Sequence, residues 1–267
     1  MQHRGGTPAR RHNKTAGTFR RVGGAVAACL ALALVTGCEG LDETPSAAGG
    51  GEAAADGRSV SPLDNPDGTK PGLAPVTGEA DQAKAREIIE QVKTKGRGPK
   101  TGYARDEFGY AWMDTADGVP LARNGCDTRN DLLQRDGQDL RFREGSDCVV
   151  ISMTIDDPYT GTTIDWRKEK ASEVQIDHVV PLSYSWQMGA KQWPVSKRKQ
   201  LANDVLNLIP VEGRANSAKG DSGPATWLPP NKSVRCAYAV RFAQVAVKYE
   251  MPVTAPDRDE MLRQCGG

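Results

Sequence analysis

The residues of this chain best suited to chemistry lie in one stretch, where an acid and a histidine stand side by side. Asp177 and His178 end an apolar run, and Asn216 follows further along. A neutral imidazole accepts a proton near physiological pH, and Asp and Asn side chains offer hard oxygen ligands that suit Mg²⁺ or Mn²⁺. A base beside such a cation can hydrolyse a phosphodiester, because the base activates water and the cation stabilises the developing negative charge.

Each of these residues also has a purely structural interpretation. His178 could be a core histidine bonded to the backbone, Asp177 could cap a turn, and Asn216 could cap a helix. The surrounding sequence favours the chemical interpretation. His178 is also the only histidine after residue 38, because His3 and His12 lie near the start of the chain.

The elements that must position these residues are two strands and a helix. Residues 174–180 and 205–211 read as strands, and residues 216–219 open a helical turn. Further strands are predicted at 148–155 and 162–166, and helices at 81–95, 127–135, 196–203, 231–250 and 256–265. Helices outnumber short, locally connected strands, so the sequence predicts an α+β fold.

The core Asp-His-x-x-Pro-Leu, with Asn-x-x-Lys-Gly downstream, resembles the HNH (ββα-metal, His-Me finger) endonucleases. More narrowly, it looks like the exported HNH family of actinobacteria. The resemblance extends over most of residues 101–265. It includes the segments Tyr103 to Gly109, Asn124 to Asn130, Asp157 to Gly161 and Ala225 to Pro230.

The resemblance implies a ββα-metal finger embedded in a mainly helical single domain. It assigns His178 as the general base, Asp177 and Asn216 as the holders of one divalent cation, and Asn207 as support for the loop that carries the histidine. Mg²⁺ is the favoured cation and Mn²⁺ the alternative. Asn216 stands where some relatives carry a second histidine, which argues against a zinc or nickel site.

Two cations are candidates for holding the phosphate. Lys219 belongs to the core motif, whereas Arg129 lies far from it in sequence. Lys219 could instead be a solvated surface residue, and Arg129 could pair with Asp127 or Asp131. A basic cleft is possible around the motif, where six cations cluster: Lys191, Lys197, Arg198, Lys199, Arg214 and Lys219.

The first 38 residues predict export. Six basic residues precede the apolar run Val22 to Val35, which is shorter than a membrane span and typical of a signal peptide. The run ends at Cys38 in a sequence that resembles a bacterial lipobox, which implies lipidation of Cys38. An ordinary secretory signal with a chance cysteine is the alternative.

Charge and composition divide the rest of the chain. Residues 39–80 are rich in Gly, Ala, Pro and acids, so we predict a disordered tether. Residues 81–267 hold 27 basic and 26 acidic residues and form the predicted nuclease domain. This near-neutral balance predicts modest, salt-dependent binding of nucleic acid with little sequence specificity.

Four cysteines remain in the predicted domain, namely Cys126, Cys148, Cys236 and Cys265. In an exported domain they favour two disulfides, and three pairings are possible. We choose the sequential pairing, Cys126 with Cys148 and Cys236 with Cys265, because it closes the shorter loops. A zinc site built from all four is the alternative, although no CxxC spacing supports it.

These features predict an exported, metal-dependent endonuclease with little sequence specificity. A lipid on Cys38 would anchor it to the outside of the cell membrane, and it would be secreted if that site is unused. DNA is favoured over RNA as substrate, and no obligate protein partner is evident. The alternatives are a non-enzymatic surface lipoprotein that binds polyanions or a protein partner through the same scaffold, and a hydrolase of other phosphoesters.

Overall fold

Residues 58–267 are the part of the chain that the structure, a computed structural model, describes. The predicted signal peptide, the lipidation site Cys38 and residues 39–57 of the predicted tether lie outside the described residues. Within the described part, no helix is both long enough and apolar enough to cross a membrane.

The packed body begins before residue 81, where the sequence places its boundary. Residues 58–80 contain the 3₁₀ helix η1 (Pro62–Asp64), and Leu73 and Val76 are only 2% and 4% exposed. The backbone N–H of Gly72 donates to Asp136 at 2.6 Å. The prediction of a tether up to residue 80 is therefore wrong for residues 58–80. The few apolar side chains of this segment pack into a core that other parts of the chain supply.

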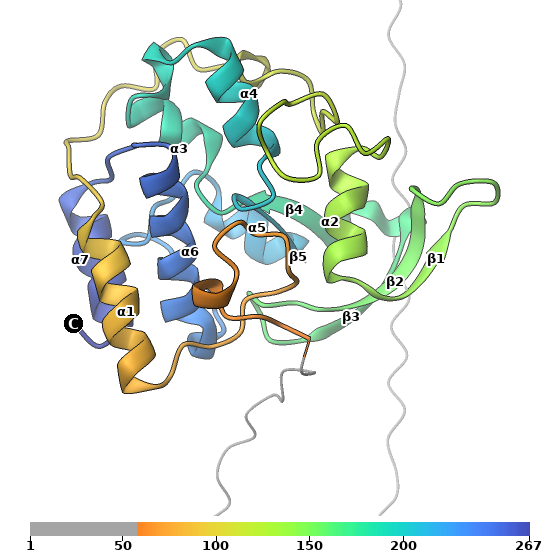
Figure 1. The fold of residues 1–267 in the computed structure, drawn as a ribbon, viewed down its shortest axis with the longest axis horizontal. Helices are drawn as coiled ribbons and strands as arrows, with labels where there is room; N and C mark the ends of the chain where they lie inside the picture. The colour runs from red at the N-terminus through yellow and green to blue at the C-terminus, as the bar shows by residue number, and fades with distance from the viewer. Residues whose placement is uncertain (1–57) are drawn as a thin grey trace, which may run out of the picture. The chain divides into compact units, whose positions relative to one another are not determined.

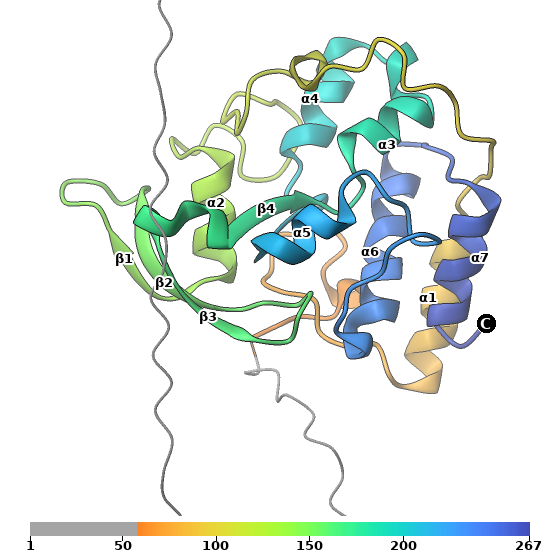
Figure 2. The same cartoon turned by 180° about the vertical axis from the view of Figure 1, so that it is seen from behind.

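Three helices form one side of the described unit. They are α1 (Glu79–Glu90), α6 (Arg235–Lys248) and α7 (Ala255–Gln264), and both views show them side by side (Figures 1 and 2). The helix α6 is buried along most of its length, so its neighbours cover it on several sides. A disulfide between Cys236 and Cys265 joins the start of α6 to the residue after α7.

A three-stranded antiparallel sheet forms the opposite side (Figure 1). Its order is β1 (Gln138–Phe142), β2 (Val150–Asp156), β3 (Thr163–Arg167). The helix α2 (Thr128–Asp136) joins this sheet in a second apolar cluster, which includes Leu132, Leu133 and Trp166. The strand β1 was not predicted, because its exposed and half-buried positions carry mostly polar residues.

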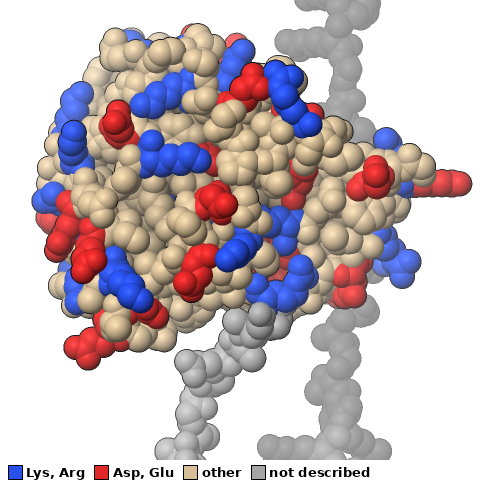
Figure 3. Space-filling view, viewed as in Figure 1, with Lys and Arg blue, Asp and Glu red and all other residues tan. Residues whose placement is uncertain are grey.

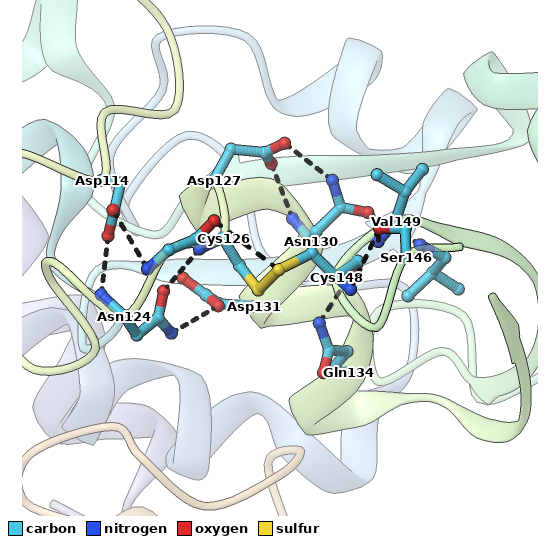
Figure 4. The surroundings of a disulfide bond; sticks show 12 residues. Asp114, Asn124, Cys126, Asp127, Asn130, Asp131, Gln134, Ser146, Cys148 and Val149 are labelled. Atoms are coloured by element: carbon cyan, nitrogen blue, oxygen red, sulfur yellow. Dashed lines mark hydrogen bonds between the residues drawn. A yellow bond between two sulfur atoms is a disulfide. The ribbon is translucent and has the colours of Figure 1, made fainter. Parts of the chain in front are cut away.

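The second disulfide fastens the start of α2 to the loop between β1 and β2 (Figure 4). Asp127 caps α2 by accepting the N–H of Asn130 at 2.9 Å. Gln134 donates to the carbonyl of Cys148 at 3.1 Å. Both disulfides follow the predicted sequential pairing, which is confirmed.

A two-stranded antiparallel unit lies between these two sides and leads into a helix (Figure 2). It consists of β4 (Val174–His178), β5 (Leu208–Glu212) and α5 (Gly213–Lys219). The helices α3 (Leu182–Gln187) and α4 (Val195–Asn203) connect the two strands. The mixed α+β architecture is confirmed, although α3 was not predicted.

The start of α5 depends on a capping carboxylate and a close backbone approach. Glu212 accepts the N–H of Ala215 at 2.6 Å, which starts the helix three residues before the predicted Asn216. A Cβ on Gly213 would stand 2.1 Å from the carbonyl oxygen of Ser172. Only glycine therefore fits at this position.

We expect reduction of the two disulfides to lower the melting temperature strongly. Each native disulfide of a small secreted domain contributes about 2–5 kcal/mol to the free energy of unfolding. Thermal unfolding of the wild type with and without dithiothreitol measures the effect. A variant with all four cysteines replaced by alanine is the control, because reductant should leave it unchanged. An unchanged melting temperature of the reduced wild type would contradict the prediction.

Candidate active site

A cleft of about 370 Å³ opens beside the end of β4. The strand contributes Asp177 and His178 to its wall, and α5 contributes Asn216. The segment before α2 supplies Tyr103 and Arg105 to the lining. Three separate parts of the chain therefore meet around the predicted base.

The imidazole of His178 has a defined hydrogen-bonding direction. Its Nε2 lies 3.0 Å from the carbonyl oxygen of Ala202 at the end of α4. Because a carbonyl oxygen only accepts, Nε2 carries the proton and Nδ1 of the neutral ring is left as an acceptor. Burial and the nearby Arg105 lower the pKa of His178 to about 3. The ring is therefore neutral at physiological pH.

Asn207 connects the residues after His178 to α4. Its Oδ1 accepts the N–H of Val180 at 2.8 Å, and its Nδ2 donates to the carbonyls of Val180 and Leu201 at 3.3 and 3.2 Å. The side chain is fully buried. These contacts place Asn207 where it can support the loop after the histidine, and its role in activity stays a prediction.

Asp177 forms a buried ion pair with Lys219. The Lys219 ammonium lies 2.9 and 2.8 Å from the two carboxylate oxygens, and the hydroxyl of Tyr159 donates to Oδ2 at 2.5 Å. Lys219 also donates to the carbonyl of His178 at 2.8 Å. Burial raises the pKa of Asp177 and lowers the pKa of Lys219, and the attraction between them opposes both shifts.

This ion pair corrects the predicted role of Lys219. Its side chain has no exposed surface, so its ammonium cannot extend to a phosphate in the cleft. The sequence suggested a phosphate contact because the lysine belongs to the motif. The packing of α5 against β4 turns it towards Asp177 instead.

The cleft offers two side chains with hard oxygen atoms, the kind of ligand that a divalent cation takes. Nδ2 of Asn216 donates to Gln175 at 2.9 Å, and its Oδ1 has no partner within the described residues. Asp177 accepts from Lys219 on both carboxylate oxygens, from the Tyr159 hydroxyl on Oδ2 and from the backbone N–H of His178, so a cation would have to share this carboxylate with an ammonium. Within residues 58–267, no three His, Cys, Asp or Glu side chains are grouped to hold a metal. Any cation here would therefore depend on Asn216 as well as Asp177.

Arg129 lies away from the cleft. Its guanidinium donates to the carbonyl of Val174 at 3.2 Å and lies 5.9 Å from the ring centre of Trp166. It supports the beginning of β4, so its predicted phosphate role is not supported by its position. Arg105 lines the cleft instead. The sequence did not predict a role for Arg105, because nothing in its local sequence distinguishes it from other exposed arginines.

The predicted basic cluster is not a continuous surface. Arg198 is mostly buried and pairs with Glu107 at 3.0 Å, and the Lys219 side chain is fully buried. Acidic and basic side chains are interspersed over the face drawn in Figure 3. That face therefore carries mixed charge and no basic stripe.

The fold and the site define an α+β domain with an acid–histidine pair ending one strand and an asparagine on the helix after the next strand. A family model for the C-terminal domain of GmrSD restriction endonucleases matches residues 127–264. The chain therefore belongs to this family and is related to nucleases.

One relative gives a broader match. The chain is 38% identical over 186 residues to an uncharacterized secreted protein of Arthroderma benhamiae, and the match covers 68% of this chain and 84% of that protein. No solved structure matches the chain. The narrower resemblance to exported actinobacterial enzymes stays a prediction.

We expect Asp177→Ala to lower the free energy of unfolding by about 3–5 kcal/mol, because it leaves the Lys219 ammonium buried without a counter-charge. Urea unfolding at pH 7, followed by circular dichroism, measures the change. The double variant Asp177→Ala/Lys219→Met removes both charges and should recover most of the loss. If both variants are equally unstable, the ion pair is not the cause.

Proposed function

We propose that this protein is an exported, metal-dependent HNH endonuclease that hydrolyses phosphodiesters in nucleic acid with little sequence specificity. The unit β4–β5–α5 would be its ββα-metal finger. The observation that carries the proposal is the neutral imidazole of His178, whose Nδ1 is free to accept a proton in a cleft shared with Asp177 and Asn216. Membership of a restriction-endonuclease domain family supports the same reaction.

The proposed reaction begins at His178. Its Nδ1 accepts a proton from a water molecule as the water oxygen attacks phosphorus, and the bond from phosphorus to the leaving oxygen breaks. When bound by Asp177 and Asn216, a divalent cation supplies charge neutralisation at the phosphate and the leaving oxygen. Mg²⁺ is the proposed ion, with Mn²⁺ as an alternative, because both donors are hard oxygens.

Arg105 is the proposed phosphate-binding residue. Its guanidinium lines the cleft with His178, and no ion pair engages it among the described residues. Lys100, which also lines the cleft, is paired with Asp221 at 3.0 Å. A guanidinium can donate two parallel hydrogen bonds to phosphate oxygens.

Nucleic acid is the proposed substrate, with DNA favoured over RNA. The near-neutral charge of residues 81–267 supports modest binding that weakens with salt. The secreted description of the relative from Arthroderma benhamiae supports export. Lipid anchoring through Cys38 remains part of the proposal on the basis of the lipobox-like sequence.

One observation favours the non-enzymatic alternative. The carboxylate of Asp177 is already paired with an ammonium, so a cation must share this ligand with Lys219. If Lys219 prevents metal binding, the cleft would serve as a polyanion-binding site of a surface lipoprotein, with Arg105 as its free cation.

We expect a chain beginning at residue 39 to cut plasmid DNA or RNA with Mg²⁺ or Mn²⁺ and to be inactive in EDTA. His178→Ala should lower the rate by about 10²–10⁴-fold, because it removes the proton acceptor. Asn216→Ala should weaken Mn²⁺ binding, measured by the electron paramagnetic resonance of free Mn²⁺. A folded wild type that binds nucleic acid without cutting it in either metal would favour the alternative.

We expect Arg105→Ala to weaken nucleic-acid binding about tenfold or more, which corresponds to the loss of one charge-assisted hydrogen bond of about 1.5 kcal/mol. Fluorescence anisotropy with a labelled oligonucleotide measures binding, in a His178→Ala background that prevents cutting. Arg129→Ala is the matched control, because this arginine lies outside the cleft and should affect stability alone. Equal losses of affinity in the two variants would refute the assignment.

A further inference from the structure

The indole ring of Trp112 is stacked nearly parallel to the imidazole of His178. The two ring centroids are 6.2 Å apart and the ring planes differ by only 14°. Trp112 precedes the histidine by more than sixty residues and belongs to an irregular segment before α2. Neither proton transfer at His178 nor cation binding beside it requires an aromatic ring at this position.

The backbone of Trp112 adopts an uncommon conformation. Its φ angle is +60°, in the left-handed region that a bulky side chain rarely occupies. Such conformations persist where the surrounding structure enforces them, and they cluster at functional sites. The contacts around Trp112 therefore need to be accounted for.

Hydrogen bonds from two helices hold the backbone at Trp112 and Met113. The carbonyl of Trp112 accepts the N–H of Thr128 at 3.4 Å, and Thr128 Oγ1 donates to the carbonyl of Met113 at 3.1 Å. The N–H of Met113 donates to Asn203 Oδ1 at 2.8 Å. Thr128 begins α2 and Asn203 ends α4, so two helices fix the segment.

The last turn of α4 contacts both the histidine ring and the backbone beside Trp112. Ala202 accepts from Nε2 of His178 at 3.0 Å. The next residue, Asn203, accepts from the backbone N–H of Met113, directly after Trp112, whose indole is stacked nearly parallel to the imidazole. The imidazole is thus constrained along its edge by a hydrogen bond and across its face by a stacked ring.

We propose that Trp112 is a positioning residue that fixes the imidazole plane of His178, so that Nδ1 faces the cleft in a single tautomer. The inference rests on the proposed function, because it assumes that His178 is the base. The hydrogen bond to Ala202 alone allows the ring to tilt about the Nε2–O direction, whereas a stacked indole restricts that tilt. A role limited to packing would affect stability but not the ring state of His178.

The single histidine after residue 38 makes the proposal directly measurable. In a chain starting at residue 39, ¹⁵N-labelled histidine gives the NMR signals of His178 alone, and their shifts report which ring nitrogen carries the proton. We expect the wild type to show one tautomer with the proton on Nε2. We expect Trp112→Leu, which keeps an apolar side chain but loses the flat face, to show averaged or broadened ring signals.

Kinetics give the second measurement. Trp112→Leu should lower kcat by about 10- to 100-fold with KM little changed, because misplacing a reacting group costs rate and not substrate binding. Trp112→Phe keeps an aromatic face and should restore both kcat and the single tautomer. Trp193→Leu is the matched control, because Trp193 stacks on Tyr249 and does not contact His178.

The outcomes separate this inference from the proposed function. If the wild type does not cut nucleic acid but Trp112→Leu loses the single tautomer, the positioning role stands and the nuclease proposal fails. If the wild type cuts and Trp112→Leu keeps both its tautomer and its kcat, the positioning role is wrong. If Trp112→Leu does not fold, Trp112→Phe decides, and a changed tautomer in that folded variant would also overturn the role of the aromatic face.

Discussion

The ion pair between Asp177 and Lys219 connects the parts of the fold on which the cleft depends. It joins β4 to the last turn of α5, and Tyr159 extends the contact to the turn after β2. Both charges are out of water, so neither is tolerable without the other. The lysine also holds the backbone carbonyl of His178. One buried pair therefore sets the position of the strand end, the helix and the histidine backbone together.

Separate contacts and crosslinks stabilise the helical side and the sheet side of the fold around this pair. On one side, α6 is surrounded by other helices and crosslinked through Cys236 to Cys265. On the other, the disulfide between Cys126 and Cys148 fastens α2 to the sheet. The strands β4 and β5 lie between these sides. Side chains from distant segments can therefore meet at His178 with fixed geometry, which its proposed role as a proton acceptor requires.

Electrostatics in the cleft is set by which cations already have partners. Lys219 is paired with Asp177, and Lys100 with Asp221. Among the cleft residues of the described part, Arg105 is left without a carboxylate partner, and its charge helps to keep His178 neutral. The same guanidinium can thus favour the basic form of the histidine and attract a phosphate. This arrangement needs no extended basic surface, which agrees with the near-neutral charge of the domain.

The local order of strand, strand and helix was predictable from sequence, because apolar periodicity and the motif around Asp177, His178 and Asn216 are short-range features. The sequential disulfides were also predictable, since short loops favour them. Tertiary structure alone decided that Lys219 is buried, that Arg105 and not Arg129 lines the cleft, that residues 58–80 join the body, and that Trp112 covers His178. The physical reason is that spacing along a chain determines which face of an element a residue occupies. The partner that it meets there, whether water, a carboxylate or an aromatic ring, depends on segments far away in sequence.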